Sequence, residues 1–189
     1  FFKYRMNFIH RIPKAYSKES CNLLIKWFKN NLDKSKPGFG GKKQLDNLEI
    51  CLEIKDLESY FGLGKTLANS IENFKSKYPL IDKHISKWKV NNFVQLMKYK
   101  PNSYYNTIHC ENDGDPRHLK RVFAWMIFLN DIKKGGGTKF IFQNYTAKPK
   151  AGDFYIWSAS WTHLHQGINA PKETKYILTG WCDYEFGAT

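Results

Sequence analysis

The stretch "FAWMIFL", residues 123–129, is apolar at every position. A strand with one face in water alternates apolar and polar side chains, so an unbroken apolar run of this length indicates a strand that is buried on both faces. The stretch "FYIW", residues 154–157, repeats this pattern. We expect both stretches to be strands that are buried on both faces.

Short apolar runs separated by turn residues surround these two stretches. The predicted strands cover residues 93–100, 104–110, 121–130, 138–143, 153–158 and 174–184. Such a succession is typical of an antiparallel sandwich or barrel. The fold class that we predict is mostly β with flanking α-helices, namely a double-stranded β-helix (jelly roll) packed against N-terminal helices.

The segment before residue 92 has a helical character. Residues 17–32 open with a serine and carry apolar residues at helical spacing. Residues 56–78 also carry apolar residues at roughly helical spacing until Pro79 stops them, and Gly62 and Gly64 are candidate interruptions. The glycine-rich residues 36–43 predict a flexible surface loop or lid. We therefore expect one domain over residues 1–189, with helical support in 1–91 and a jelly-roll catalytic core in 92–186.

Composition bounds the class of protein. The chain has 189 residues, of which 42% are hydrophobic, enough for one well-buried core. A net charge of +13 would suit a polyanionic partner such as nucleic acid. The lysines are scattered singly among Asn, Ile, Tyr and Phe, however, as AT-rich coding would also produce. We take the charge as compositional and do not expect a nucleic-acid partner, while an acidic peptide substrate stays open.

The cysteines and the hydropathy of the chain indicate in which cellular compartment the protein is expected. The four cysteines form no CxxC pair, which favours a reducing compartment, and no run of eighteen apolar residues indicates a membrane span. We expect a soluble, cytoplasmic protein with no membrane partner. Because the chain begins at Phe1, a removed leader stays open. The sequence does not predict the oligomeric state.

The stretch "HCE", residues 109–111, raises the question of a metal site. On a strand, residues i and i+2 point to the same side, so His109 and Glu111 would project into one space. Ferrous iron is often held by two imidazoles and one carboxylate on one side of an octahedron. "WTHLHQG", residues 161–167, offers His163 and His165 as the second imidazole. Alone, the His-x-Glu pair is a weak signal, because polar pairs are common at strand ends.

Lys175 begins an apolar predicted strand ten residues after His165. A buried lysine is costly unless it is paired. Two interpretations follow: either the stem is buried and the ammonium reaches water, or the ammonium binds an anionic cosubstrate.

Together these residues resemble the iron(II) and 2-oxoglutarate dependent dioxygenases, and among them the prolyl 4-hydroxylase-like branch. The resemblance covers roughly residues 92–184. It lies in five ordered elements: His109-Cys110-Glu111, Gly136-Gly137-Thr138-Lys139-Phe140, Pro149-Lys150-Ala151-Gly152-Asp153, His165 and Lys175. It implies that His109, Glu111 and His165 are the catalytic residues that bind iron. The spacing to Lys175 selects His165 over His163, which would then support a ligand or face the substrate.

The resemblance also implies a cosubstrate site. Lys175 would bind 2-oxoglutarate, Thr179 and Trp181 would line the same end of the barrel, and Tyr99 would reach the cosubstrate unless it is an ordinary core aromatic. Phe128 stands where several relatives have a tyrosine that bonds the distal carboxylate, so that carboxylate should depend more on Lys175. Glu111 replaces the usual aspartate, and a glutamate serves as the carboxylate ligand in other such triads.

The implied activity is a dioxygenase reaction. With Fe(II), O2 and ascorbate as the reductant, 2-oxoglutarate would be decarboxylated to succinate and CO2 while a peptide or protein, most simply a proline-containing one, is hydroxylated at prolyl C4. Residues 34–43 and 112–120 would form walls of a peptide groove, although the latter also fit a solvated turn. Alternative substrates are a free amino acid or other small molecule and, third, a nucleic acid. A non-catalytic jelly-roll binding protein would require broken ligands, and none is broken.

Overall fold

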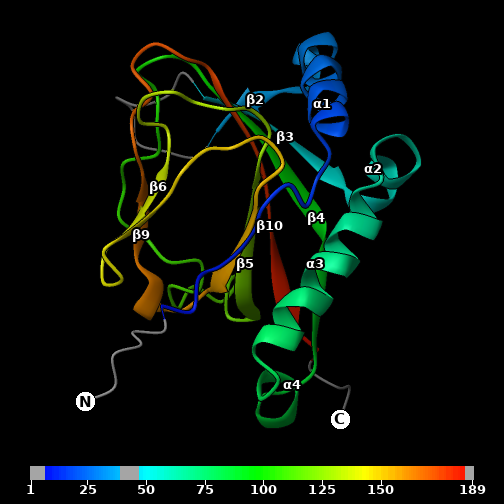
Figure 1. The fold of residues 1–189 in the computed structure, drawn as a ribbon, viewed down its shortest axis with the longest axis vertical. Coiled ribbons are helices and arrows are strands. Elements are labelled where there is room, and N and C mark those ends of the chain that lie inside the picture. The colour runs from blue at the N-terminus through cyan, green and yellow to red at the C-terminus, as the bar shows by residue number, and fades with distance from the viewer. Residues whose placement is uncertain (1–6, 39–46, 186–189) are drawn as a thin grey trace.

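The computed structural model describes residues 7–38 and 47–185 (Figure 1). A seven-stranded antiparallel sheet stands in the middle, helices cover its outer face, and a three-stranded sheet lies on the inner side. The two sheets enclose the interior of a jelly roll. The predicted fold class is therefore confirmed.

The elements follow one another in a helix-rich first half and a strand-rich second half. They are β1 (His10–Ile12), α1 (Lys18–Asn30), η1 (Leu32–Lys34), β2 (Lys36–Pro37), β3 (Asn47–Glu53), α2 (Ile54–Phe61), α3 (Leu63–Lys77), α4 (Ile81–His84), β4 (Trp88–Tyr99), β5 (Arg121–Phe128), β6 (Thr138–Phe140), β7 (Tyr145–Ala147), β8 (Phe154–Ser158), η2 (Trp161–His163), β9 (His165–Gly167) and β10 (Lys175–Tyr184). The large sheet has the order β1-β8-β5-β10-β4-β3-β2 and the small sheet the order β7-β6-β9.

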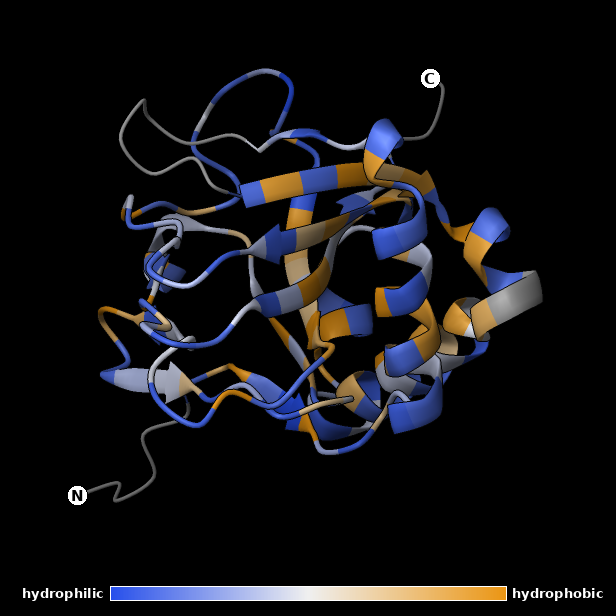
Figure 2. Ribbon diagram, turned by 90° about the horizontal axis from the view of Figure 1, so that it is seen from above, coloured by the Kyte–Doolittle hydropathy of each residue, from blue (hydrophilic) through white to orange (hydrophobic). Residues whose placement is uncertain are grey.

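The first helix begins and packs as its sequence predicts. The Ser17 hydroxyl accepts a hydrogen bond from the Ser20 amide at 2.9 Å and so caps α1. Cys21, Leu24 and Phe28 lie on one side of the helix and are fully buried against the sheet. Figure 2 shows the helices coloured in alternating hydrophilic and hydrophobic stretches, as amphipathic elements require.

The segment predicted as one second helix, residues 56–78, forms the two helices α2 and α3. Gly62 ends α2 and precedes α3 with φ at +61°, a left-handed conformation that glycine adopts without steric cost. The expected interruption at Gly62 is confirmed. α3 then runs to Lys77, two residues before Pro79.

Strand β10 separates two cores because its side chains alternate between the faces of the sheet. Tyr176, Leu178 and Cys182 join the larger cluster between the sheet and the helices. Ile177 joins the smaller cluster inside the barrel, together with residues of β4, β5, β6 and β8. The apolar run of β5 is buried on both faces, as predicted from its sequence.

Several details of the strand prediction are wrong, and the short strands β1, β7 and β9 were not predicted. Residues 104–110 do not form a strand, because within them only His109 pairs, in an isolated bridge with His165. Strand β3, "NLEICLE", was missed within the segment expected to be helical; its two glutamates hide the pattern of a strand that pairs along β4. The expected strand over 138–143 ends at Phe140, where the chain turns.

The expected glycine-rich loop lies partly outside the described residues. Lys36 and Pro37 form the short strand β2 against β3, and residues 39–46 are not described. No helix in the described ranges is both long and apolar enough to cross a bilayer.

Candidate metal and cosubstrate site

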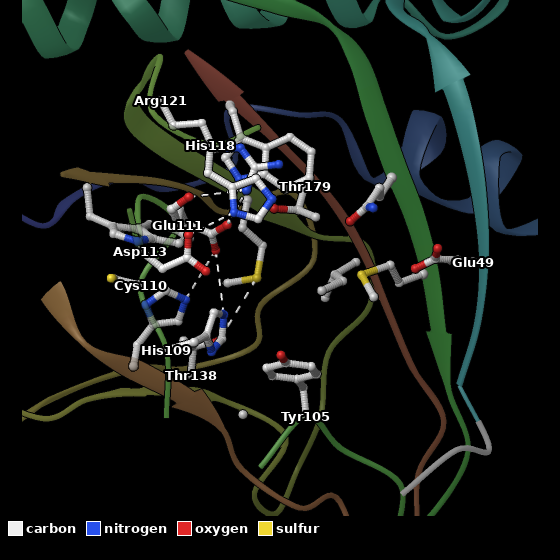
Figure 3. A pocket seen from close by; sticks show the side chains of 18 of the residues that line it. Glu49, Tyr105, His109, Cys110, Glu111, Asp113, His118, Arg121, Thr138 and Thr179 are labelled. Carbon is white, nitrogen blue, oxygen red and sulfur yellow. Dashed lines mark hydrogen bonds and ion pairs between the residues drawn. The ribbon is translucent and has the colours of Figure 1, made fainter. Parts of the chain in front are cut away.

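A cavity of about 420 Å³ lies inside the barrel (Figure 3). Its wall is formed by β3, β4, β5, β6, β8, β9 and β10, and its rim by the loop before β5. All seven residues that the sequence analysis places in the site line this one cavity: Tyr99, His109, Glu111, His165, Lys175, Thr179 and Trp181. Residues from 99 to 181 in the chain thus meet in a single space.

Three of these residues form a compact group of potential metal ligands. The Nε2 atoms of His109 and His165 lie 3.6 Å and 3.5 Å from Oε1 of Glu111. One donor atom from each residue can be chosen so that all lie within 4.8 Å of one another. Figure 3 shows Glu111 between His109 and Arg121 at one end of the cavity.

Backbone pairing, rather than a shared strand face, brings the group together. The His109 amide donates to the His165 carbonyl at 3.0 Å, and the His165 amide donates back at 2.9 Å. Two residues later the Glu111 amide donates to the Ala159 carbonyl at 3.1 Å. The strand that we predicted around His109 is absent, yet one bridge fixes the spacing that the strand was expected to provide.

Both imidazoles are oriented by carbonyl groups behind them. Nδ1 of His109 lies 2.9 Å from the Thr107 carbonyl, and Nδ1 of His165 lies 2.9 Å from the His163 carbonyl. A carbonyl only accepts, so each ring must carry a proton on Nδ1, and in the neutral ring this leaves the lone pair of Nε2 directed at the cavity. This arrangement is typical of histidines that bind metal ions.

Glu111 is held as an anion. Burial alone would raise its pKa, but contacts with His109 and His165 outweigh burial and hold the pKa of Glu111 well below its ordinary value. Its second oxygen, Oε2, accepts a hydrogen bond from the Trp181 indole at 2.6 Å and lies 3.6 Å from Arg121. The carboxylate is thus available to a cation without losing a proton.

His163 is turned away from the cavity. Its Nε2 lies 3.0 Å from the Asn7 carbonyl and its Nδ1 lies 3.0 Å from the Thr162 hydroxyl. The ring lines a separate apolar groove of about 790 Å³ beside α3 and α4. Only the backbone carbonyl of His163 serves the site, by orienting His165.

Lys175 is a buried cation without a carboxylate partner among the described residues. It is only 4% exposed, and burial lowers its pKa to about 8. Its Nζ lies 4.5 Å from the centroid of the Tyr99 ring, a cation–π contact. Such burial does not fit an ammonium that reaches bulk water, so the interpretation as a partner for an anion is favoured.

The other expected cosubstrate residues differ in what their polar atoms do. The Thr179 hydroxyl donates to the Trp125 carbonyl at 2.8 Å, and the Tyr99 hydroxyl lies 3.6 Å from the Met97 sulfur. Trp181 contacts Glu111 at the metal end. Phe128 is fully buried and packs edge-on against Tyr155 at 5.8 Å, so it offers no hydroxyl to the cavity.

Arg121 is a site residue that the sequence analysis missed. It stacks on the Trp181 ring at 4.0 Å and donates to the Glu111 carbonyl at 3.2 Å. Its one signal in the sequence is a charge at the first position of an otherwise apolar strand. At the rim, Asp113, Arg117 and His118 also line the cavity, and Asp113 bonds His118 at 2.9 Å.

Comparison with known families agrees with this geometry. Residues 94–183 match the model of the 2OG-Fe(II) oxygenase superfamily. The segment that carries the candidate site thus matches this superfamily. The matched segment runs from β4 to β10 and contains all of the expected metal and cosubstrate residues. Among the curated proteins compared with the chain, none matches.

Solved structures show the same fold over almost the whole chain. A viral collagen prolyl hydroxylase from Paramecium Bursaria Chlorella virus-1, in complex with 2OG, has a TM-score of 0.72 at 20% identity and covers 95% of this chain and 97% of its own. A Pseudomonas putida prolyl-4-hydroxylase has a TM-score of 0.71 at 11% identity and covers 95% and 94%. A Trichoplax adhaerens prolyl hydroxylase, bound to a peptide fragment of hypoxia inducible factor, has a TM-score of 0.68 at 13% identity and covers 95% and 84%.

The residues present fit the cofactors of the superfamily, Fe(II) and 2-oxoglutarate. The Nε2 atoms of two imidazoles and one carboxylate oxygen converge at one end, which is the donor set that suits ferrous iron. In the same cavity Lys175 holds a positive charge that no described carboxylate neutralises. A dianion that also binds iron would satisfy both requirements.

Proposed function

We propose that this oxygenase is a prolyl 4-hydroxylase acting on a peptide or protein. One observation carries the proposal: the group formed by His109, Glu111 and His165 shares its cavity with the buried, uncompensated Lys175. Similarity in fold to several prolyl hydroxylases favours prolyl over other targets.

Different residues would bind the iron and the 2-oxoglutarate. His109 and His165 would donate through Nε2 and Glu111 through Oε1 to the iron, and Lys175 would form a charge-assisted hydrogen bond to the far carboxylate of 2-oxoglutarate. Iron with 2-oxoglutarate and O2 supplies the oxidation, in which a substrate C–H becomes C–OH while 2-oxoglutarate becomes succinate and CO2. The barrel walls would shield one side of this chemistry from water.

A polypeptide would reach the cavity along its rim. The loop of residues 112–120 contributes Asp113, Arg117 and His118 to the lining, which supports the proposal that this loop is one wall of a peptide groove. Arg117 is already paired with Asp115, through contacts of 2.9 and 2.8 Å, so the loop is braced internally. The other expected wall lies mostly in residues 39–46, outside the described residues.

Succinate formation tests the proposal directly. The purified protein would be incubated with Fe(II), ascorbate and 2-oxoglutarate, with and without a proline-rich peptide. We expect the peptide to stimulate succinate release and to gain one oxygen atom, located on prolyl C4 by fragmentation. His109→Ala should abolish both signals, whereas His84→Ala, at an exposed histidine, should leave them unchanged.

The other outcomes separate the alternative substrates. Turnover that free proline or another amino acid stimulates, and the peptide does not, would replace the peptide substrate by a small molecule. An oligonucleotide substrate would reveal itself by stimulation that falls steeply with salt. Absence of succinate in protein shown to contain iron would contradict the oxygenase activity itself.

A further inference from the structure

The carboxylate of Glu111 has two oxygens in different surroundings. Oε1 faces the two histidine Nε2 atoms at 3.5 Å and 3.6 Å. Oε2 faces the opposite way, toward the Trp181 indole at 2.6 Å and the Arg121 guanidinium at 3.6 Å. Glutamate carries one more methylene than aspartate, so its carboxylate can rotate more freely unless it is held.

Two irregularities of strand pairing lie next to Arg121 and Trp181. Pairing of β10 with β4 shifts between Gly180 and Cys182, which leaves Trp181 without a partner on β4. Pairing of β10 with β5 shifts between Cys182 and Asp183, which leaves Val122 without a partner on β10. Such bulges re-aim side chains and are frequent beside active sites.

The second irregularity explains why Arg121 reaches the cavity. Phe123 and Trp125, at alternate positions of β5, pack on the helix side of the sheet, and regular alternation would send Arg121 there as well. Because Val122 is skipped, Arg121 instead turns toward Glu111 and stacks on Trp181 at 4.0 Å. The stacked guanidinium in turn restricts the indole.

We propose that Trp181 and Arg121 are positioning residues that hold Oε2 of Glu111, so that the carboxylate presents only Oε1 to the metal. The inference rests on the metal site of the proposed function and concerns how this chain accommodates a glutamate ligand. The indole hydrogen bond is matched to the length of glutamate, since an aspartate at position 111 would withdraw the carboxylate by one methylene. Neither positioning residue is required to touch the metal.

A double-mutant cycle between positions 181 and 111 tests this arrangement. Trp181→Phe removes the N–H donor and keeps an aromatic ring under Arg121, and Glu111→Asp shortens the ligand. Binding of Co(II), used as a spectroscopic substitute for Fe(II), would be titrated in both backgrounds. In the native background Trp181→Phe should weaken Co(II) binding by about 10- to 100-fold, the range found for outer partners of metal ligands. In the Glu111→Asp background it should change binding less than about twofold, because no hydrogen bond remains to lose.

Controls separate positioning from folding. Trp161→Phe, at an indole that is 67% exposed, should leave Co(II) binding unchanged in both backgrounds. Metal-free Trp181→Phe should unfold at a temperature close to that of the native protein. If it does not fold, Arg121→Met, which keeps an apolar stem on the indole, gives the same readout: weaker Co(II) binding beside glutamate and no change beside aspartate.

The visible spectrum of bound Co(II) supplies a second readout. Release of Oε2 would allow the carboxylate to bind through both oxygens, so the ligand-field bands of the Trp181→Phe protein should change in position and intensity. Equal losses of affinity in both backgrounds, or an unaltered spectrum and affinity, would overturn the inference while leaving the metal site intact. Absence of Co(II) binding in the native protein would overturn both the inference and the proposed metal site.

Discussion

The two ends of the cavity differ in how their buried charges are paired. At the metal end, the carboxylate of Glu111 lies among two imidazoles, an indole donor and a guanidinium. At the other end Lys175 is buried against an aromatic ring, and no carboxylate among the described residues pairs with it. The charge at the first end is compensated by the protein itself, whereas we propose that a bound anion compensates the charge at the second.

The largest expected effect would come from breaking the compensated end. His165→Ala removes one of three ligands and should lower Fe(II) affinity by more than about 100-fold, beyond what loss of an outer partner costs. Isothermal titration under anaerobic conditions would measure it, with His84→Ala as the exposed control. Retention of stoichiometric tight iron binding would show that His165 is not a ligand.

Loss of the charge of Lys175 should weaken the binding of 2-oxoglutarate. Lys175→Met removes a charge-assisted hydrogen bond and should raise the KM for 2-oxoglutarate by about 10- to 150-fold, with Fe(II) affinity unchanged. The same change should stabilise the ligand-free protein by about 1 to 3 kcal/mol, because a pKa lowered from 10.5 to about 8 reports a charge that folding disfavours. Lys139→Met, at an exposed lysine, serves as the control in steady-state kinetics and thermal unfolding. An unaltered KM would remove Lys175 from the cosubstrate site.

The pH dependence at this end should have two opposite signs. Between pH 8 and 10.5 the unfolded chain keeps the Lys175 proton that the folded chain has lost, so stability from this group rises with pH. Over the same range the affinity for 2-oxoglutarate should fall, up to tenfold per pH unit, because the anion needs the ammonium. Lys175→Arg keeps the charge throughout and should flatten the binding curve. A native binding curve that is flat above pH 8 would contradict this assignment.

The smallest expected effect concerns the aromatic ring beside the buried cation. Tyr99→Phe keeps the cation–π contact and removes a hydroxyl that lies 3.6 Å from the Met97 sulfur. We expect the KM for 2-oxoglutarate to rise by about twofold to tenfold, the value of one ordinary hydrogen bond. A rise as large as that of Lys175→Met would mean that the hydroxyl is a principal anchor of the cosubstrate.

The sequence predicts the site better than it predicts the backbone that carries it. The residues that the resemblance selects all line one cavity, because the order of His109, His165 and Lys175 reflects fixed positions in the jelly roll. The prediction of a strand around His109 is wrong, because a single bridge to His165 of β9 holds this residue in place. Strand β3 was not predicted because its glutamates obscure the alternation of apolar and polar residues. It forms because it can pair along β4, which its own sequence does not reveal.

The contacts of Arg121 could not be predicted from the sequence. Regular alternation along β5 places this residue on the helix side, and only the irregular pairing at Val122 turns it to the cavity. Trp181, by contrast, faces the cavity through the regular alternation of β10, which it shares with Lys175 and Thr179, and its indole meets Glu111 there. Bulges depend on tertiary context, and no pattern in the sequence predicts them.

The alternation along β10 has a consequence for how this protein can fail. Lys175, Ile177, Thr179 and Trp181 line the cavity, while the intervening residues fill the core beneath the helices. A slip of one residue in strand pairing would exchange the two sets, moving the apolar core residues into the cavity and a lysine into the core. Such a misfolded chain would lose its catalytic centre and its hydrophobic core in a single event. Quality control in the cell could therefore remove inactive molecules by recognising their exposed apolar surface alone.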